Sequence, residues 1–223
     1  MSRSDREATL RIGIVGPGQI GLALSHRWYE AGHEIFYTFS RSQEKLQRLA
    51  SELGERGSWG TPARAGKVCD VLVLSTKWKQ VPEAIEQMGN LGGKILLETV
   101  NPISEDGNLE IGHVTSAGEQ IAQMALGAVT VGAFHSVPAT VIGASRDPAD
   151  LYQGQKPVVF YCGGDERAKR VVAELISAAG FDPCDTGPID SCRYLEPLAL
   201  LMIRAASVIQ IRDISLGLLR PRR

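Results

Sequence analysis

Residues 10–21 read LRIGIVGPGQIG, a short β-branched run followed by the pattern G-x-G-x-x-G, which is formed by Gly16, Gly18 and Gly21. The run predicts a strand over 10–15, and the apolar spacing after it predicts a helix over 19–31. In this pattern the first glycine permits a tight turn, the second lets backbone approach a pyrophosphate, and the third lets the helix pack closely on the strand. The stretch therefore predicts a dinucleotide site at the start of the helix, with an ordinary glycine turn as the alternative.

The second predicted strand, over 34–39, indicates which dinucleotide would bind. A fold selective for NAD places an acidic residue roughly 20 positions beyond the glycines, whereas a fold selective for NADP places arginine nearby. Here the strand leads into Ser40 and Arg41 without a carboxylate, and Lys45 follows one helical turn later. A hydroxyl, a guanidinium and an ammonium suit a 2′-phosphate, so the sequence favours NADP. The alternative is that Arg41 and Lys45 are solvated surface charges.

Strand-like and helix-like stretches alternate along the rest of the chain. Further strands are expected over 70–75, 94–98, 129–134, 157–162 and 181–184, and further helices over 43–53, 81–88, 118–126, 166–179 and 194–219. This alternation predicts an α/β fold with a doubly wound, mostly parallel Rossmann sheet. Pro138 and Pro148 interrupt the pattern, so we expect an NADP-binding domain over 1–140 and a small carboxy-terminal α/β lobe over 141–223. The lobe would serve substrate binding or dimerisation and end in a long helix.

The composition of the 223 residues narrows the class of protein. Hydrophobic residues make up 43% and charged residues 22%, as in an ordinary globular chain. The 24 Lys and Arg against 25 Asp and Glu give a net charge of −1, so binding of nucleic acid or a membrane surface is not expected. The four cysteines lack C-x-x-C spacing, and the amino terminus lacks the apolar stretch of a signal peptide. We therefore expect a cytoplasmic protein with reduced thiols and no metal site.

The predicted closing helix over 194–219 carries more apolar residues than one helix face can bury. Charged residues within it, including Arg204, Arg212 and Asp213, argue against a membrane span. The surplus apolar surface predicts packing against a second copy across a twofold axis, and hence a homodimer.

Several segments together resemble the NADPH-dependent coenzyme F420 reductases and their bacterial relatives. They are VGPGQIG, SRSQEK, STKW, ETVNPIS, AFHSVPA and the long stretch that begins at GGDERAKRVV and runs through DTGPID to RYLEPLALLMI. The resemblance covers nearly the whole chain. It implies a small two-lobed homodimer that moves a hydride between NADP(H) and a deazaflavin.

The resemblance also implies roles for individual residues. Together with the glycine pattern and the cationic pair, those expected to bind the dinucleotide are Gly16, Pro17, Gly18, Gln19, Ile20, Gly21, Ser40, Arg41, Lys45, Ser75, Trp78, Pro82, Asn101 and Ala139. Within this set, Trp78 and Pro82 would border the cleft and Ala139 would lie near the nicotinamide. His135 stands where the deazaflavin reductases also have histidine, and it is the catalytic candidate. The alternatives are that Trp78 serves packing and that His135 is a core histidine at a strand end.

Hydride transfer between flat heterocycles requires positioning and exclusion of water more than a proton relay, which accounts for the lack of a catalytic triad or carboxylate pair in the sequence. Lys77 and residues 99–101 depart from the pattern of the known reductases, so a flavin, a ferric complex or another small substrate is an alternative acceptor. A non-catalytic NADPH sensor is a further alternative. The related imine reductases and β-hydroxyacid dehydrogenases need a larger helical second lobe than the residues after 140 provide.

Overall fold

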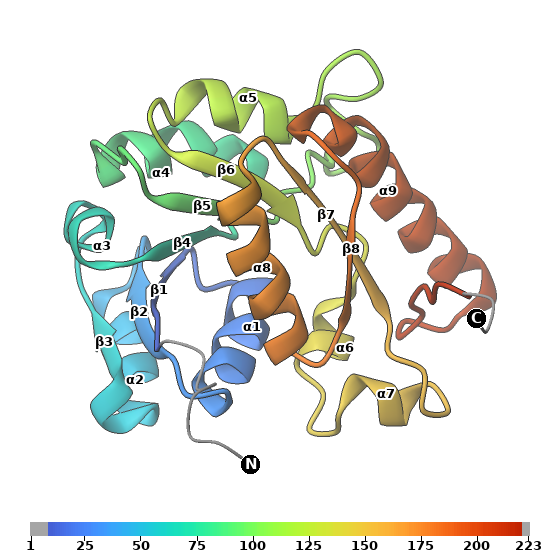
Figure 1. The fold of residues 1–223 in the computed structure, drawn as a ribbon, viewed down its shortest axis with the longest axis horizontal. Coiled ribbons are helices and arrows are strands. Elements are labelled where there is room, and N and C mark those ends of the chain that lie inside the picture. The colour runs from blue at the N-terminus through green and yellow to red at the C-terminus, as the bar shows by residue number, and fades with distance from the viewer. Residues whose placement is uncertain (1–8, 220–223) are drawn as a thin grey trace.

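The computed structural model describes residues 9–219, which form one eight-stranded sheet with helices on both faces (Figure 1). The strands are β1 Arg11–Val15, β2 Glu34–Thr38, β3 Gly57–Trp59, β4 Val71–Leu74, β5 Ile95–Glu98, β6 Val129–Ala133, β7 Val158–Gly163 and β8 Asp182–Asp185. Their order in the sheet is β3-β2-β1-β4-β5-β6-β7-β8, and every neighbouring pair is parallel except β6 with β7. This topology confirms the predicted doubly wound, mostly parallel Rossmann sheet.

The α-helices are α1 Gln19–Glu30, α2 Gln43–Glu52, α3 Pro62–Val68, α4 Val81–Met88, α5 Ala117–Met124, α6 Ala139–Ile142, α7 Pro148–Leu151, α8 Glu166–Ala178 and α9 Cys192–Ile209. Short 3₁₀ turns, η1 Gly54–Arg56, η2 Trp78–Gln80 and η3 Ile189–Ser191, lie between them. The sequence analysis did not predict β3, α3, α6 or α7. Each is only three to seven residues long, which is too short to show a hydrophobic period. Among the helices of residues 9–219, none is long and apolar enough to cross a lipid bilayer.

Alternating strand residues divide the core between the two faces of the sheet. On β4, Val71 and Val73 pack with α1, α2 and α8, whereas Leu72 and Leu74 pack with α3, α4 and α5. All four are fully buried, so β4 has the continuous apolar character that its sequence predicts for a strand covered on both faces.

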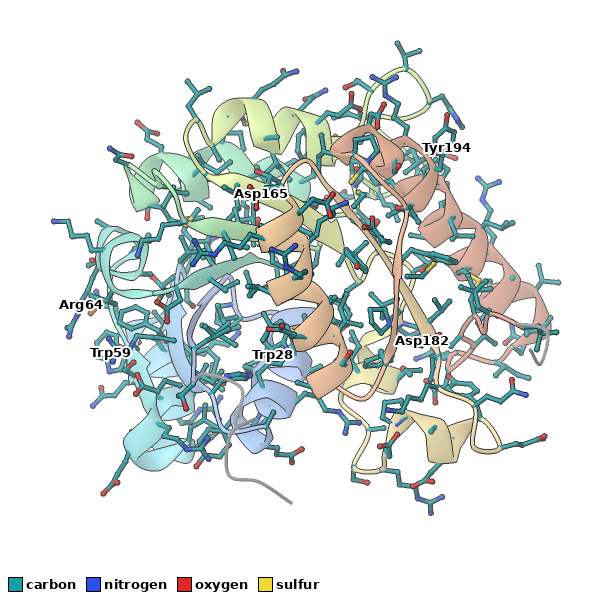
Figure 2. All side chains as sticks on the ribbon, in the orientation of Figure 1. Trp28, Trp59, Arg64, Asp165, Asp182 and Tyr194 are labelled. Atoms are coloured by element: carbon teal, nitrogen blue, oxygen red, sulfur yellow. The ribbon has the colours of Figure 1, made fainter. Side chains whose placement is uncertain are left out.

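Trp28 joins the first helix to the last strands of the sheet. Figure 2 labels Trp28 among the side chains near α1 and α8. Its indole N–H donates to the carbonyl of Leu175 on α8 at 2.8 Å, and its ring meets Phe134 edge-to-face at 6.3 Å. Phe134 in turn meets Phe181 at 6.0 Å. β7, α8 and β8 therefore extend the same sheet and core as the amino-terminal strands, and the division at residue 140 stays a prediction.

The predicted helix over 194–219 is wrong at its carboxyl end. α9 ends at Ile209, where Gln210 takes the left-handed conformation with φ of 56°, and residues 211–219 turn back as irregular chain. The apolar spacing continues past Ile209, but hydrogen bonds from distant residues hold Asp213 outside a helix. Figure 1 shows α9 at one side of the molecule, with the chain reversing at its end.

Candidate functional site

The carboxyl ends of β1 and β4 form the point where the sheet order reverses. From β1 the chain moves outward through β2 and β3, and it then returns to place β4 on the other side of β1. This reversal is the topological switch point of the sheet. In open α/β sheets, ligands bind in the crevice at such a point.

The turn after β1, residues 16–21, has the geometry of a phosphate-binding loop. Gly16 has a φ of 83°, and its N–H donates to the carbonyl of Thr38 at 3.1 Å. A Cβ on Gly21 would overlap the hydroxyl of Ser75, whereas the nearest atom to a Cβ on Gly18 would be 3.8 Å away. Packing within the protein therefore requires glycine at 21 but not at 18. The absence of a side chain at 18 leaves space beside the loop, and the predicted approach of a pyrophosphate there stays a prediction.

Ser75 supports this loop from the end of β4. Its hydroxyl donates to the carbonyl of Gly16 at 2.8 Å, and its N–H donates to the carbonyl of Val15 at 3.0 Å. Ser75 thus holds the turn in place from below. Its predicted contact with the dinucleotide itself stays a prediction.

The predicted 2′-phosphate clamp lies at the end of β2, beside the phosphate loop. Lys45, in the first turn of α2, donates its ammonium to the carbonyl of Pro17 at 2.8 Å. Ser40 lies half-buried and accepts from the N–H of Ser42, which caps α2. Arg41 is exposed and has no hydrogen bond or ion pair with any residue of the described range. Lys45 thus lies next to Pro17, and Ser40 and Arg41 precede it in the chain after β2, with the Arg41 side chain exposed. Their binding of a 2′-phosphate stays a prediction.

A cleft of about 550 Å³ opens beside the phosphate loop, between the strand ends and α9. One wall consists of Gln19 and Ile20 from the start of α1, Thr99 and Asn101 after β5, and residues 134–139 after β6. The other wall consists of α9 between Ala199 and Gln210, with Arg212 and Ile214. The cleft thus brings together five predicted residues, at positions 19, 20, 101, 135 and 139, and it adds a second wall that the sequence analysis did not identify.

Trp78 and Pro82 lie after β4 and do not line this cleft. Trp78 begins η2, where it is half-buried and packs against the core cluster of α3, α4 and α5. Pro82 is exposed in the first turn of α4. Their predicted position at the border of the dinucleotide site stays a prediction.

The imidazole of His135 is turned into the protein. Its Nε2 lies 2.9 Å from Oε1 of Glu98, and the side chains are only 1% and 0% exposed. Burial alone would lower the pKa of His135, but the Glu98 carboxylate outweighs it and raises the pKa to about 9. The backbone carbonyl of His135 accepts from the Asn101 amide at 2.9 Å. His135 thus shapes the cleft wall, and a catalytic role for its ring stays a prediction.

A buried network surrounds the pair of Glu98 and His135. The Cys192 thiol donates to Glu98 at 3.5 Å and lies 3.3 Å from the sulfur of Cys162. Glu196 accepts from the N–H groups of Ala117 and Gly118 at the start of α5, both at 3.1 Å. Burial, helped by Glu98, raises the pKa of Glu196 to about 7. The sequence analysis did not identify Glu98 and Glu196 as candidate site residues. A signal was present, because Glu98 ends the apolar strand KILLE and Glu196 lies within an apolar helix.

The donor atoms of Glu98, His135 and Cys192 lie within 4.8 Å of one another, a spacing that could also hold a metal ion. Hydrogen bonds between the three side chains account for the arrangement, and we assign no metal to it. The four cysteines are free thiols in the structure.

Comparisons with known proteins give consistent matches. A sequence model of the family described as NADP oxidoreductase, coenzyme F420-dependent, matches residues 11–102. An F420-dependent NADP reductase from Methanocaldococcus jannaschii is 26% identical over 211 residues, which cover 87% of this chain and 91% of that protein. The metalloreductase STEAP3 from Rattus norvegicus is 26% identical over 193 residues, 86% of this chain. That match spans only 37% of STEAP3, so this chain corresponds to about a third of it.

Solved structures share the fold. A protein of Arthrobacter sp. FB24, assigned provisionally as an F420-dependent NADP-reductase, superimposes with a TM-score of 0.83 at 23% identity, over 95% of this chain and all of its own. A reductive aminase from Aspergillus terreus in complex with NADPH4 has a TM-score of 0.63 at 19% identity, over 91% of this chain and 63% of its own. Together, the family match over residues 11–102, the relative of similar length and the shared fold confirm the resemblance of this chain to the coenzyme F420-dependent NADP oxidoreductases.

Proposed function

We propose that the protein transfers a hydride between NADP(H) and a deazaflavin such as coenzyme F420, or a flavin-like acceptor. The observation that carries this proposal is the position of the cleft, which opens directly beside the phosphate loop and extends to α9. A dinucleotide with its pyrophosphate on residues 16–21 would direct its nicotinamide into this cleft. The part of the cleft next to α9 would then be left for the acceptor.

The adenosine end of the dinucleotide is the better supported half of the proposal. The N-terminal end of α1 offers backbone N–H groups and the positive end of a helix dipole to the pyrophosphate. Ser40 and Arg41 follow the neighbouring strand β2, and Lys45 lies in the first turn of α2. The hydroxyl and the two cations would bind the 2′-phosphate, which distinguishes NADP from NAD.

Asn101 supports the placement of the nicotinamide. Its amide N–H donates to the carbonyl of His135, whereas its Oδ1 is buried and has no partner among residues 9–219. Asn101 lines the cleft near Ile20 and Ala139. The free oxygen suits the carboxamide N–H of a nicotinamide, because a buried acceptor without a partner gains from a ligand donor.

The walls of the cleft suit the transfer of a hydride between two flat rings. The α9 wall presents mainly small or apolar side chains, among them Ala199, Met202 and Ala206. Such walls exclude water and let two ring systems stack, so the reacting carbons approach each other without a proton relay.

We propose a narrower role for His135 than direct contact. Because its imidazole is 1% exposed and bonded to Glu98, it would act on the acceptor through the wall of the cleft. Through its backbone carbonyl, which accepts from the Asn101 amide at 2.9 Å, His135 would position the wall against which the rings lie.

The homodimer and the cytoplasmic location stay proposals. The side of α9 that faces away from the core exposes Tyr194, Leu201, Val208 and Ile209 (Tyr194 in Figure 2). This exposed apolar surface supports the predicted pairing of two copies through α9.

The decisive experiment follows NADPH oxidation by the purified protein with coenzyme F420, FMN, FAD or a ferric chelate as acceptor. The ferric chelate tests the activity named for STEAP3. We expect turnover with F420 or a flavin, and a clear preference for NADPH over NADH in the same assay. Tight binding of NADPH without turnover on any acceptor would instead support the sensor, and turnover on the ferric chelate alone would support a metalloreductase.

A further inference from the structure

The segment after α9 contributes to the lining of the cleft. The chain reverses its direction at Gln210. We call residues 210–216 the strap, and Arg212 and Ile214 among them line the cleft. Arg212 faces this space opposite Gln19, Ile20 and residues 134–139 of the other wall. The strap thus places a charged side chain at a cleft whose α9 wall is mainly apolar.

Both ends of the strap are fixed by hydrogen bonds. The N–H of Ile211 donates to the carbonyl of Ala206 at 3.2 Å, and the N–H of Val158 donates to the carbonyl of Leu216 at 2.8 Å. Between them, the hydroxyls of Thr140 and Tyr152 donate to the carboxylate and the carbonyl of Asp213, each at 2.5 Å. The backbone of Arg212 therefore lies between two anchored residues.

The anchor at Thr140 is itself tied to the dinucleotide side of the cleft. Thr140 belongs to α6. The guanidinium of Arg27, on α1, donates to the carbonyl of Ile142 at the end of α6 and to the carbonyls of Ala144 and Arg146 after it. α1 also begins at the phosphate loop. The position of Arg212 is thus set relative to the phosphate loop through contacts that do not involve a ligand.

The charges around the cleft leave Arg212 uncompensated. Of the residues that line it within the described part of the chain, only His135 and Arg212 are basic and none is acidic. His135 is buried and paired with Glu98, whereas Arg212 is exposed and has no hydrogen bond or ion pair to any described residue. The nearest carboxylate in sequence, Asp213, is bonded to Thr140. The cleft therefore offers one free guanidinium to a ligand.

We propose that Arg212 binds a phosphate or carboxylate of the hydride acceptor and so determines which acceptors the protein prefers. A guanidinium matches both groups with two parallel hydrogen bonds. The phosphates of NADP have other partners available, at the start of α1 and at Ser40, Arg41 and Lys45. The inference rests on the proposed function for the identity of the ligand as an acceptor.

FMN and riboflavin test this inference, because they share one ring system and differ in a single phosphate. At saturating NADPH we expect a lower KM for FMN than for riboflavin. In Arg212→Ala the KM for FMN should rise about tenfold or more, while the KM for riboflavin and both kcat values change little. Arg212→Lys should show an intermediate KM for FMN, because a lysine keeps the charge but loses the fork.

Arg170→Ala is the matched control, because Arg170 is an exposed arginine on α8 away from the cleft. It should leave both KM values unchanged. An equal rise for both flavins in Arg212→Ala would overturn the inference in favour of packing. A rise in the KM for NADPH instead would assign Arg212 to the dinucleotide.

A binding measurement separates failure of this inference from failure of the proposed function. If neither flavin oxidises NADPH, binding of FMN and riboflavin to the NADP-loaded protein is followed by quenching of flavin fluorescence. Tighter binding of FMN that is lost in Arg212→Ala keeps the inference while the proposed hydride transfer to flavins fails. Equal binding of the two flavins, or no binding of either, overturns the inference.

Discussion

The candidate site has two halves, which are built in different ways. The half at the phosphate loop offers backbone N–H groups and three polar side chains from residues 16–45, and Arg41 lies exposed without a hydrogen bond or ion pair to any described residue. The half at β6 and α9 has mainly small or apolar side chains at its α9 surface and keeps most of its charges beneath, in the network of Glu98, His135 and Glu196. The first half leaves its binding groups open to a ligand, whereas the second satisfies them within the protein.

This difference predicts different consequences of mutation. Changes in the first half should weaken dinucleotide binding and leave the fold intact, because the affected groups have few partners in the protein. Changes in the buried network should lower stability and alter its pH dependence, because those groups are bonded to each other. A loss of stability from changes in the first half, or a loss of dinucleotide binding alone from changes in the buried network, would contradict this difference.

The largest effect on binding is expected from Gly18→Ala. A Cβ at this position would have no protein atom closer than 3.8 Å, so the unfolding free energy should change by less than about 0.5 kcal/mol. The methyl group would occupy the space through which the pyrophosphate approaches, and the Kd for NADPH should rise at least tenfold. Fluorescence titration with NADPH and urea denaturation measure the two quantities.

Two further glycines serve as controls for this prediction. Gly21→Ala should instead lower the unfolding free energy by about 1–3 kcal/mol, because its Cβ would overlap the Ser75 hydroxyl and lie 2.9 Å from a methyl of Ile14. Gly164→Ala should change neither quantity, since Gly164 is exposed and nothing lies within 4 Å of its Cβ. Unchanged NADPH binding in Gly18→Ala would show that this loop does not hold the pyrophosphate.

The largest effect on stability is expected from Glu98→Gln, which removes the carboxylate partner of His135. Loss of one member of a buried ion pair should lower the unfolding free energy by about 3 kcal/mol. The pKa of His135 is raised to about 9 in the folded protein, above the 6.5 of an unperturbed histidine. The stabilisation from its protonation is therefore complete below about pH 6.5 and is lost as the pH rises through about 9.

Denaturation of Glu98→Gln between pH 6 and pH 10 should accordingly show a flatter decline in stability than the unsubstituted protein. Glu86→Gln makes the same charge change at an exposed position of α4 and should preserve the steep decline. Glu196, whose pKa is raised to about 7 mainly by burial, adds a loss of stability between about pH 4.5 and 7. This loss should be smaller in Glu98→Gln, because Glu98 helps to raise that pKa. An identical decline above pH 7 in Glu98→Gln would exclude the ion pair as its source.

The same difference explains which parts were predictable from the sequence. The phosphate loop lies within six consecutive residues and its partners at 40–45 follow a single helix, so short-range patterns predict both. The pair of Glu98 and His135 is separated by 37 residues, and Glu196 bonds to N–H groups 78 and 79 residues away. No local pattern specifies such contacts, which arise when β5, β6, α5 and α9 pack together.

The strap shows why the error in the last helix occurred. Apolar residues recur at helical spacing through Leu218, so a reading based on periodicity continues the helix. The chain leaves the helix at Gln210, and Thr140 and Tyr152, which precede Asp213 by 73 and 61 residues, bond to it there. Tertiary hydrogen bonds thus outweighed a local preference, and they also brought Arg212 to the cleft.

The smallest of the effects considered for the two halves is expected from Arg41→Ala. Arg41 is exposed, so its loss should not change the unfolding free energy beyond about 0.5 kcal/mol. A guanidinium that binds the 2′-phosphate contributes on the order of 1.5 kcal/mol, so the Kd for NADPH should rise about tenfold. The Kd for NADH, which lacks this phosphate, should stay the same.

Arg48→Ala is the matched control for Arg41→Ala, because Arg48 is exposed on α2, the helix that follows Arg41, and forms an ion pair with Glu52 at 3.9 Å. It should leave both affinities unchanged. Raising the salt concentration should weaken NADPH binding more in the unsubstituted protein than in Arg41→Ala, since a charge pair at an exposed site is screened. An equal loss of affinity for NADPH and NADH would instead mean that Arg41 supports the loop. The half of the site at the phosphate loop would then depend on contacts within the protein, as the half at β6 and α9 does.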